Sequence, residues 1–319
     1  MAETTITRDE TALAPRRVGA GMFIRALVRD RVSFLALVFL VFLILCAVVP
    51  GWIAPYEPTA QSLMMRNKPP MTVPAGGGFP HLLGTDTLGR DILSRIVHGT
   101  RISLLVAFFG VLVSGSIGIT LGTVAGVLRG RTDDVVMRVA DLQMGFPFTL
   151  LALLFLYAIG PSLVNIVIIF AIVRWPVYAR VSRSMAMSLR EAPFVEAART
   201  IGCSQARIIR HYVLPNMVSP LIVLGTMESA KLILGEATLS FLGLGIQPPA
   251  SSWGLMVATG RDYVGLAPWL VAFPGLAIFL TALSANLLAS WLRAVTDPVQ
   301  RWRWLVPRKA HDRAADDDF

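Results

Sequence analysis

Cysteine and lysine are scarce in this 319-residue chain, and each scarcity excludes a class of function. The two cysteines, Cys46 and Cys203, lack metal-ligand spacing and predict no disulfide framework. None of the three lysines lies in a G-x-x-x-x-G-K sequence followed by serine or threonine, so the chain has no P-loop of its own for ATP hydrolysis. These lysines are Lys68, Lys231 and Lys309.

Histidine is also sparse, with four scattered residues and no H-E-x-x-H sequence or Cys/His cluster. We therefore expect no metal site. No nucleophile, base and orienting group share one span, and no paired intramembrane aspartates occur, which disfavours a membrane enzyme. No catalytic residue and no cofactor-binding residue is predicted.

Charged residues make up only 15% of the chain and hydrophobic residues 55%, with a mean hydropathy of +0.64. A soluble domain has about 25% charged residues, so the composition predicts a multispanning membrane protein. The net charge of +9 is expected to reflect membrane topology, because basic residues flank membrane spans on the cytoplasmic side. No aromatic-interleaved basic patch indicates nucleic-acid binding.

Apolar segments predict an all-α membrane protein with six transmembrane helices. The third segment is weak because Arg138 and Asp141 interrupt it, and the fourth reaches Arg174 before it has spanned the about 20 residues that a bilayer needs. The predicted spans are 32–54, 102–128, 135–160, 163–173, 217–245 and 268–292.

Arginine is concentrated in the tails 1–31 and 299–319 and in the segment 174–216. The positive-inside rule places these segments, and therefore both termini, in the cytoplasm. Both tails look like solvated charge without a fold. The segment 32–101 holds the first span and an outside loop, and 102–298 forms the core domain.

In the outside loop, Thr85 or Asp86 can cap an interfacial helix that carries Leu88, Ile92 and Ile96 on one face. In the second span, glycine recurs every fourth residue at 118, 122 and 126, which lets another helix approach closely. Whether that helix belongs to this chain or to another stays open.

A polar stretch from Glu191 to Asn216 predicts a helical hairpin. Phe194, Ala197, Ala198 and Ile201 form one apolar face, Gly202 ends the first helix, Ser204 caps the second, and Pro215 stops it. The alternative to a docking role is an amphipathic helix that lies on the membrane surface.

The fifth span carries three ionisable residues, Glu228, Lys231 and Glu236. Charges are costly in a bilayer, so they should face a partner, a cavity or a water path. Glu228 and Lys231 are three residues apart and can form an ion pair. We leave two interpretations open: a structural pair at a subunit interface, or a lining of a translocation path.

Several motifs resemble one family. Glu196-Ala197-Ala198, then Gly202, then Leu214-Pro215 resemble the cytoplasmic "EAA" loop of permease subunits of bacterial ATP-binding-cassette importers, with Tyr212 where that pattern has isoleucine. In that family the loop is the coupling helix, which docks onto the ATPase. The resemblance assigns this role to the helix at about 191–209, and its coupling residues are Glu196, Ala197, Ala198, Arg199, Gly202, Leu214 and Pro215.

Two further motifs narrow the resemblance to the "C" permeases of dipeptide, oligopeptide and nickel systems. The first is GTDTLGRDILSRIVHGTR at residues 84–101, and the second is SFLGLG, QPP and SWG within 240–254. Ser251 stands where many members have proline. The resemblance covers residues 25–298.

It implies the type I importer permease (MetI-like) fold and a non-catalytic subunit of an ATP-driven peptide importer in the bacterial cell membrane. The implied partners are a paralogous permease in a heterodimer, two cytoplasmic ATPases that bind ATP and magnesium, and an extracytoplasmic solute-binding protein. Alternatives are nickel or another small solute, or a self-contained ion-coupled carrier that uses Glu228, Lys231 and Glu236.

Overall fold

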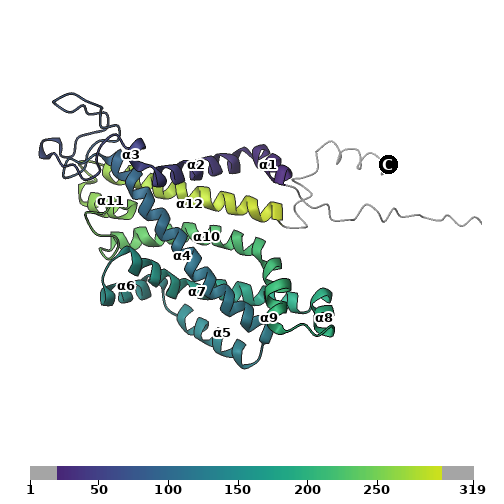
Figure 1. Cartoon of the computed structure of the whole chain (residues 1–319). Coiled ribbons are helices and arrows are strands. Elements are labelled where there is room, and N and C mark those ends of the chain that lie inside the picture. Colours follow the sequence, from purple (N-terminus) through teal and green to yellow (C-terminus); the bar gives the residue numbers. More distant parts are fainter. Residues whose placement is uncertain (1–19, 297–319) are drawn as a thin grey trace, which may run out of the picture.

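The computed structural model describes residues 20–296, and this part of the chain folds into helices without a β-strand (Figure 1). Five helices are long and apolar enough to cross a membrane, and counting one bent pair as a single span gives six crossings. The all-α prediction is confirmed, and the count of six spans holds with the bent pair as the third. The spans are α2 (Arg31–Val48), α4 (Ile92–Leu128), the pair α5 (Arg131–Met144) and α6 (Phe148–Ile159), α7 (Leu163–Arg190), α10 (Leu214–Phe241) and α12 (Trp269–Thr296).

Short helices gather at the two ends of this bundle (Figure 1). We call the end with residues 54–91 the loop end; it also holds α3 (Pro50–Ile53), α11 (Trp253–Gly260) and two 3-10 turns, Leu63–Met65 and Arg261–Tyr263. The opposite end is the hairpin end, where α8 (Pro193–Thr200) and α9 (Gln205–Ile208) protrude from the bundle.

The glycine stripe of α4 packs against α7 of the same chain, which resolves the question left open by the sequence. A Cβ at Gly122 would lie 2.1 Å from the Ala179 carbonyl oxygen, and one at Gly118 would lie 2.3 Å from the Trp175 oxygen. The two backbones are therefore in direct contact, as small residues allow between membrane helices.

The third span is bent rather than straight, because α5 and α6 meet at 88° around Gly145, Phe146 and Pro147. Gln143 fastens the bend to α7: its amide donates to the Ile172 carbonyl at 2.7 Å and its oxygen accepts from the Trp175 indole at 3.0 Å. The predicted continuous span 135–160 is corrected accordingly.

Other boundaries also move. The fourth span does not end near Arg174, because α7 continues through Pro176 to Arg190. Pro215 does not stop the second hairpin helix: a π-turn, Ile209–Val213, joins α9 to α10, and Pro215 lies in the first turn of α10, where its missing N–H is not needed.

Residues 20–29 form α1 (Ala20–Arg29), so this part of the predicted tail 1–31 is folded. Ala26 packs with Trp291 and Val295 of α12. The first span ends at Val48, and α3 continues after a break at Val49. Residues 1–19 of this tail and the whole predicted tail 299–319 lie outside the described residues.

Candidate coupling and translocation sites

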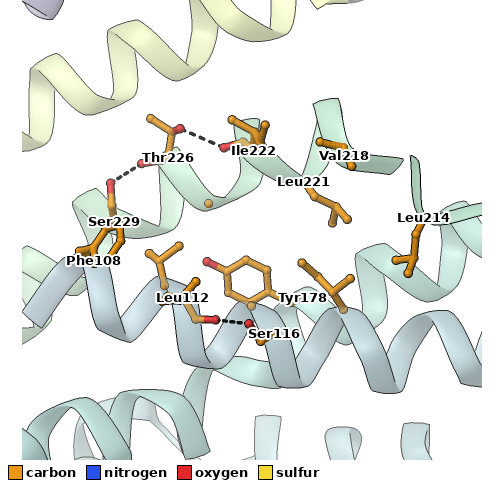
Figure 2. A pocket seen from close by; sticks show the side chains of 14 residues that line it. Phe108, Leu112, Ser116, Tyr178, Leu214, Val218, Leu221, Ile222, Thr226 and Ser229 are labelled. Atoms are coloured by element: carbon orange, nitrogen blue, oxygen red, sulfur yellow. Dashed lines mark hydrogen bonds between the residues drawn. The ribbon is translucent and has the colours of Figure 1, made fainter. Parts of the chain in front are cut away.

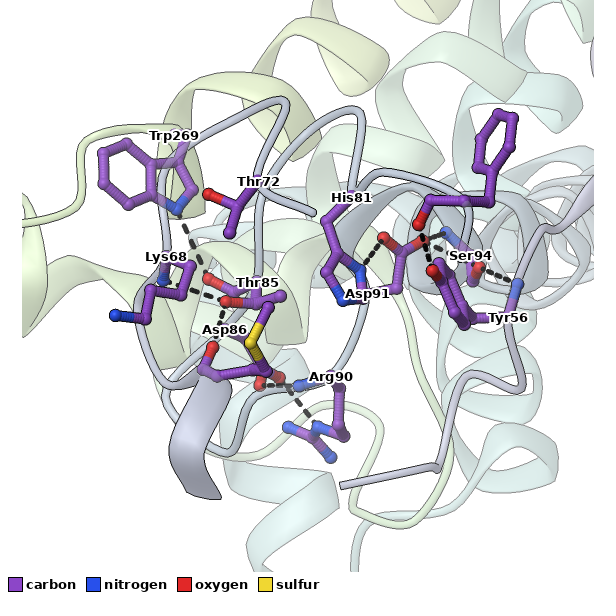
Figure 3. Close-up of polar contacts among 12 residues, drawn as sticks. Tyr56, Lys68, Thr72, His81, Thr85, Asp86, Arg90, Asp91, Ser94 and Trp269 are labelled. Carbon is purple, nitrogen blue, oxygen red and sulfur yellow. Dashed lines mark hydrogen bonds and ion pairs between the residues drawn. The ribbon is translucent and has the colours of Figure 1, made fainter. Parts of the chain in front are cut away.

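At the loop end, Asp91 begins α4 and organises its surroundings (Figure 3). Its carboxylate accepts from the Ser94 N–H at 2.7 Å, from the Ser94 hydroxyl at 2.8 Å, and pairs with His81 Nδ1 at 2.8 Å. The predicted cap at Thr85 or Asp86 is therefore wrong. No separate interfacial helix forms here, because residues 84–90 are a turn and α4 runs unbroken from Ile92.

Asp86 instead closes that turn. It accepts from the N–H groups of Leu88 and Arg90 at 2.9 Å each, and it pairs with the side chains of Arg90 and Arg95. The side chains of Asp86 and Arg95 are only 6% and 5% exposed. The GTDTLGRD sequence thus builds a buried ionic turn that holds the loop on α4.

Tyr56 completes this assembly by stacking on His81 with ring centres 4.6 Å apart and donating its hydroxyl to the Phe79 carbonyl. Burial, with a smaller contribution from the charge of Asp91, raises the pKa of Tyr56. The phenol therefore remains a hydrogen-bond donor at neutral pH.

Glu236 lies in the wall between α10 and α11 and is fully buried. One oxygen accepts from Ser240 at 2.7 Å and from Ser252 at 2.8 Å. Ser252 also caps α11, and the indole of Trp253 donates to the Ile96 carbonyl of α4 at 3.0 Å. The SFLGLG and SWG motifs therefore join α10, α11 and α4.

Glu228 and Lys231 do form the predicted ion pair, at 2.8 Å. The sequence did not identify the second cation: the Arg174 guanidinium of α7 also pairs with Glu228. Arg174 further lies 5.6 Å from the ring centre of Phe148 on α6. Glu228 is buried, whereas 58% of the Lys231 side chain is exposed. Glu236 belongs to a different cluster, about two turns further along α10.

The hairpin turn is built as the sequence predicts. Pro193 begins α8, and Gly202 has φ +84°. Gly202 N–H donates to the Arg199 carbonyl and Cys203 N–H to the Ala198 carbonyl, at 2.9 and 3.0 Å, which is a Schellman end. Ser204 caps α9 through the Arg207 N–H at 3.4 Å.

The predicted apolar face of α8 is only partly buried. Val195 and Ala198 are the buried residues, whereas Phe194 and Ile201 are 43% and 77% exposed and Ala197 is exposed too. Burial is decided by the neighbours: Val195 and Ala198 pack with Val127, Ala186 and Met217 from three other helices. The residues predicted to couple therefore divide, with Glu196, Ala197, Gly202 and Pro215 exposed and Ala198 buried, while Arg199 and Leu214 are half-buried.

Ionic and polar contacts fix the base of the hairpin to the bundle. Arg129 at the end of α4 pairs with Glu191 at 2.6 Å, and Arg190 donates to the Val127 carbonyl at 2.8 Å. The base of the hairpin is therefore attached to the ends of α4 and α7.

A groove of about 690 Å³ opens between the hairpin halves of α4 and α10 (Figure 2). The Tyr178 ring lies between the side chains of these two helices. Ser116, Thr226 and Ser229 supply its other polar groups, and no charged residue lines it.

A bundle of up to six crossings, with a polar hairpin fixed before the fifth and an ion-paired cluster within it, is the architecture expected of a membrane transport subunit. The comparisons agree. Residues 118–301 match the model of the "Binding-protein-dependent transport system inner membrane component" family, and residues 20–70 match the "N-terminal TM domain of oligopeptide transport permease C". The chain belongs to the family of binding-protein-dependent transport permeases.

Among its relatives is the di/tripeptide transport system permease protein of Pseudomonas aeruginosa, 42% identical over 82% of this chain and 86% of the relative. The glutathione transport system permease protein of Pectobacterium atrosepticum is 38% identical over 93% and 96%. The solved MetNI methionine ABC transporter, in an inward-facing form, has a chain with a TM-score of 0.53 at 20% identity, covering 65% of this chain and 98% of that one; it supports the fold.

The chain is therefore a non-catalytic permease subunit of an importer and a multi-pass protein of the bacterial inner membrane. A binding-protein-dependent transport system implies a solute-binding protein as a partner. The sequence-based predictions of the family, the fold and the transport role are confirmed.

Proposed function

We propose that this chain forms one half of the translocation path of a peptide importer, together with a second, paralogous permease. Relatives named for di- and tripeptides, D,D-dipeptides and glutathione support a short peptide as the solute. Nickel or another small solute of the same family is the alternative. The described residues contain no cluster of metal-ligating side chains to favour a metal ion.

We propose further that α8 is the coupling helix. The observation that carries this proposal is the exposed apolar face of Phe194, Ala197 and Ile201 on a helix whose other face is fixed in the bundle. An exposed apolar patch on a rigid projection is typical of a docking surface. Its occupant is a cytoplasmic ATPase, and two ATPases would bind the ATP and magnesium for which this chain has no P-loop.

In this proposal the hairpin end lies in the cytoplasm and the loop end outside. The arginines of α7, α8 and the hairpin support that orientation through the positive-inside rule. Both termini are then cytoplasmic, and the extracytoplasmic binding protein delivers its solute at the loop end. ATP-driven closure of the ATPases would move α8, and α4 and α7 would move with it.

Cross-linking tests the coupling proposal. Cys46→Ala and Cys203→Ser remove the native thiols, and Ile201→Cys then places one thiol on the exposed face of α8 within the complete importer. We expect a short thiol-directed cross-linker to join position 201 to a P-loop ATPase, with a yield that changes when ATP is added. Thr238→Cys, which is exposed but lies towards the loop end of α10, is the matched control and should give no ATPase product.

A self-contained carrier is the competing function, and the charged cluster of Glu228 and Lys231 is the observation that favours it. Such a carrier transports solute when this chain is the only protein in a liposome. If the thiol at position 201 is labelled well but no cross-link to an ATPase forms, the result would support the carrier and contradict the coupling role.

A further inference from the structure

One face of α10 between the middle of the helix and its loop end is largely exposed, and three cationic side chains lie along this face. Met227, Lys231, Leu234, Thr238 and Phe241 follow at alternating spacings of four and three, which places them on one side of the helix. Leu234 and Phe241 are 48% and 40% exposed. We call these five residues the cationic face of α10, because each cation described next lies against it.

Three cations are distributed along this face. Towards the hairpin end, the Arg293 guanidinium of α12 contacts the Met227 sulfur at 3.3 Å. Lys231 lies in the middle, and towards the loop end the Arg261 guanidinium lies 5.5 Å from the ring centre of Phe241. The row therefore extends over about 21 Å at a rise of 1.5 Å per residue.

The middle cation lies deep in the membrane. Lys231 is about 15 Å along α10 from Phe241, and Arg174 is about 17 Å along α7 from Leu163, so the loop-end termini of both helices lie at about the same distance from the cluster; we take these termini as the outer edge of the hydrocarbon core. This is half of the about 30 Å of a bilayer's hydrocarbon core. A lysine side chain at that depth is too short to reach either interface.

The cluster at this depth has one anion and two cations. Glu228 is 1% exposed and accepts from both Arg174 and Lys231, so each of its oxygens already has a cationic partner. Arg174 Nε is buried and has no hydrogen-bond partner in the part of the chain that the structure describes. One positive charge is left without a counter-charge, and it is presented on the exposed Lys231. Facing lipid, this charge would be costly, so it requires water or an anion.

We propose that the cationic face of α10 is a wall of the solute path and that Lys231, supported by Arg174, is a binding station for a carboxylate in transit. The inference rests on the proposed function, because the carboxylate is the C-terminal group of a peptide solute. Arg293 extends the favourable potential towards the hairpin end, whereas Arg261 at the loop end is paired with Asp262 at 3.1 Å and adds less. Glu228 is a positioning residue that holds the two central cations together.

The groove between α4 and α10 does not suit this task. Its lining is largely apolar and contains no charged residue, and Val218, Ile222 and Thr226 of α10 lie on it. Lys231 is on the opposite side of α10 by the helical repeat. A peptide's charged ends would lose hydration there without compensation. Thr226 therefore supplies a matched control on the opposite side of the same helix.

The test uses the complete importer in proteoliposomes, free of native thiols, with a single new cysteine. Lys231→Cys and Thr238→Cys should react with membrane-impermeant thiosulfonate reagents added to the outside when the path is open to that side, and Thr226→Cys should not. Saturating peptide carried by the binding protein should slow the reaction at position 231.

Charge is tested at the same position with two reagents of equal length. Lys231→Cys should lower the rate of peptide uptake about tenfold, the loss typical of one hydrogen bond to a charged group. Aminoethyl thiosulfonate, which restores a cation, should recover most of the rate, and sulfonatoethyl thiosulfonate should lower it further. Lys231→Arg should transport like the wild type.

The outcomes separate this inference from the function on which it rests. If the wild-type importer takes up peptide but the thiol of Lys231→Cys does not react, Lys231 does not line the path. That result overturns the carboxylate station and leaves the permease role intact. If Lys231→Gln instead releases the second permease from the complex, the counter-charge is a side chain of that partner, and the station is likewise overturned. An unmodified importer that takes up no peptide contradicts the proposed substrate itself.

Discussion

Glu228 on α10 and Arg174 on α7 are 54 residues apart in the sequence and form an ion pair in the middle of the bundle. Both side chains are largely buried, at 1% and 17% exposure. A buried pair of this kind contributes little net stability compared with apolar packing, but removing one partner leaves an uncompensated charge. The pair therefore fixes how α7 and α10 meet.

We expect Glu228→Ala to destabilise the protein by about 3–5 kcal/mol, because Arg174 loses its buried counter-charge. The double variant Arg174→Met with Glu228→Met should lose less than Glu228→Ala alone, because no buried charge is left unpaired; Lys231, which is 58% exposed, loses its partner in both proteins. Thermal unfolding in nanodiscs measures both. Equal losses in the two proteins would show that the pair does not act as a unit.

The close contact of α4 with α7 predicts a second effect. Gly122→Ala would place a methyl group 2.1 Å from the Ala179 backbone oxygen, and the helices must separate, at a cost of about 1–3 kcal/mol. Gly275 in α12 is the control: a Cβ there meets nothing within 4 Å, so Gly275→Ala should be neutral or stabilise by up to about 1 kcal/mol. The unfolding midpoints of the two variants should move apart.

Gly202 allows a test of the hairpin turn that avoids steric overlap. A Cβ at this position meets nothing within 4 Å, so only the φ of +84° opposes a side chain. We expect Gly202→Val to reduce uptake per ATP hydrolysed, because the turn no longer places α8 correctly. Gly202→Asn should be milder, since asparagine adopts left-handed conformations more readily. Equal coupling in Gly202→Val and the wild type would remove the turn from the mechanism.

The loop end should open when its ionic turn is broken. Asp86→Ala leaves the buried Arg95 without its carboxylate, and we expect faster limited proteolysis within residues 57–90. Glu57→Ala removes only an exposed bond to Thr59 and should leave the cleavage rate unchanged. Identical digestion of the two variants would contradict the role given to Asp86.

Local signals in the sequence were sufficient for much of the hairpin. Pro193, Gly202 and Ser204 mark its boundaries through backbone preferences that need no tertiary context, and the structure has all three in the predicted positions. How the apolar residues of α8 divide between interior and surface could not be predicted in this way. The sequence places Ala198 on the same apolar face as Phe194 and Ile201, whereas in the structure α4, α7 and α10 cover Val195 and Ala198 and leave Phe194 and Ile201 exposed.

Long-range partners were the other limit. Glycines at every fourth residue predict a close helix approach but not which helix approaches, and α7 is found only in three dimensions. Arg174 looked like the end of a weak span because its charge lowers the local hydropathy, and its partner Glu228 lies too far along the sequence to be recognised. The bend between α5 and α6 was missed because hydropathy measures composition and not direction.

The central claim is that this chain transports peptide only as a subunit driven by an ATPase. The most direct measurement is uptake of a labelled dipeptide into proteoliposomes that hold the complete importer with external binding protein and internal ATP, compared with liposomes that hold this chain alone. We expect the complex to take up dipeptide in an ATP-dependent manner and the isolated chain to take up none. Ala197→Asp should abolish uptake by the complex while the two permeases still assemble. Uptake by the isolated chain, indifferent to ATP and to Ala197→Asp, would contradict the central claim.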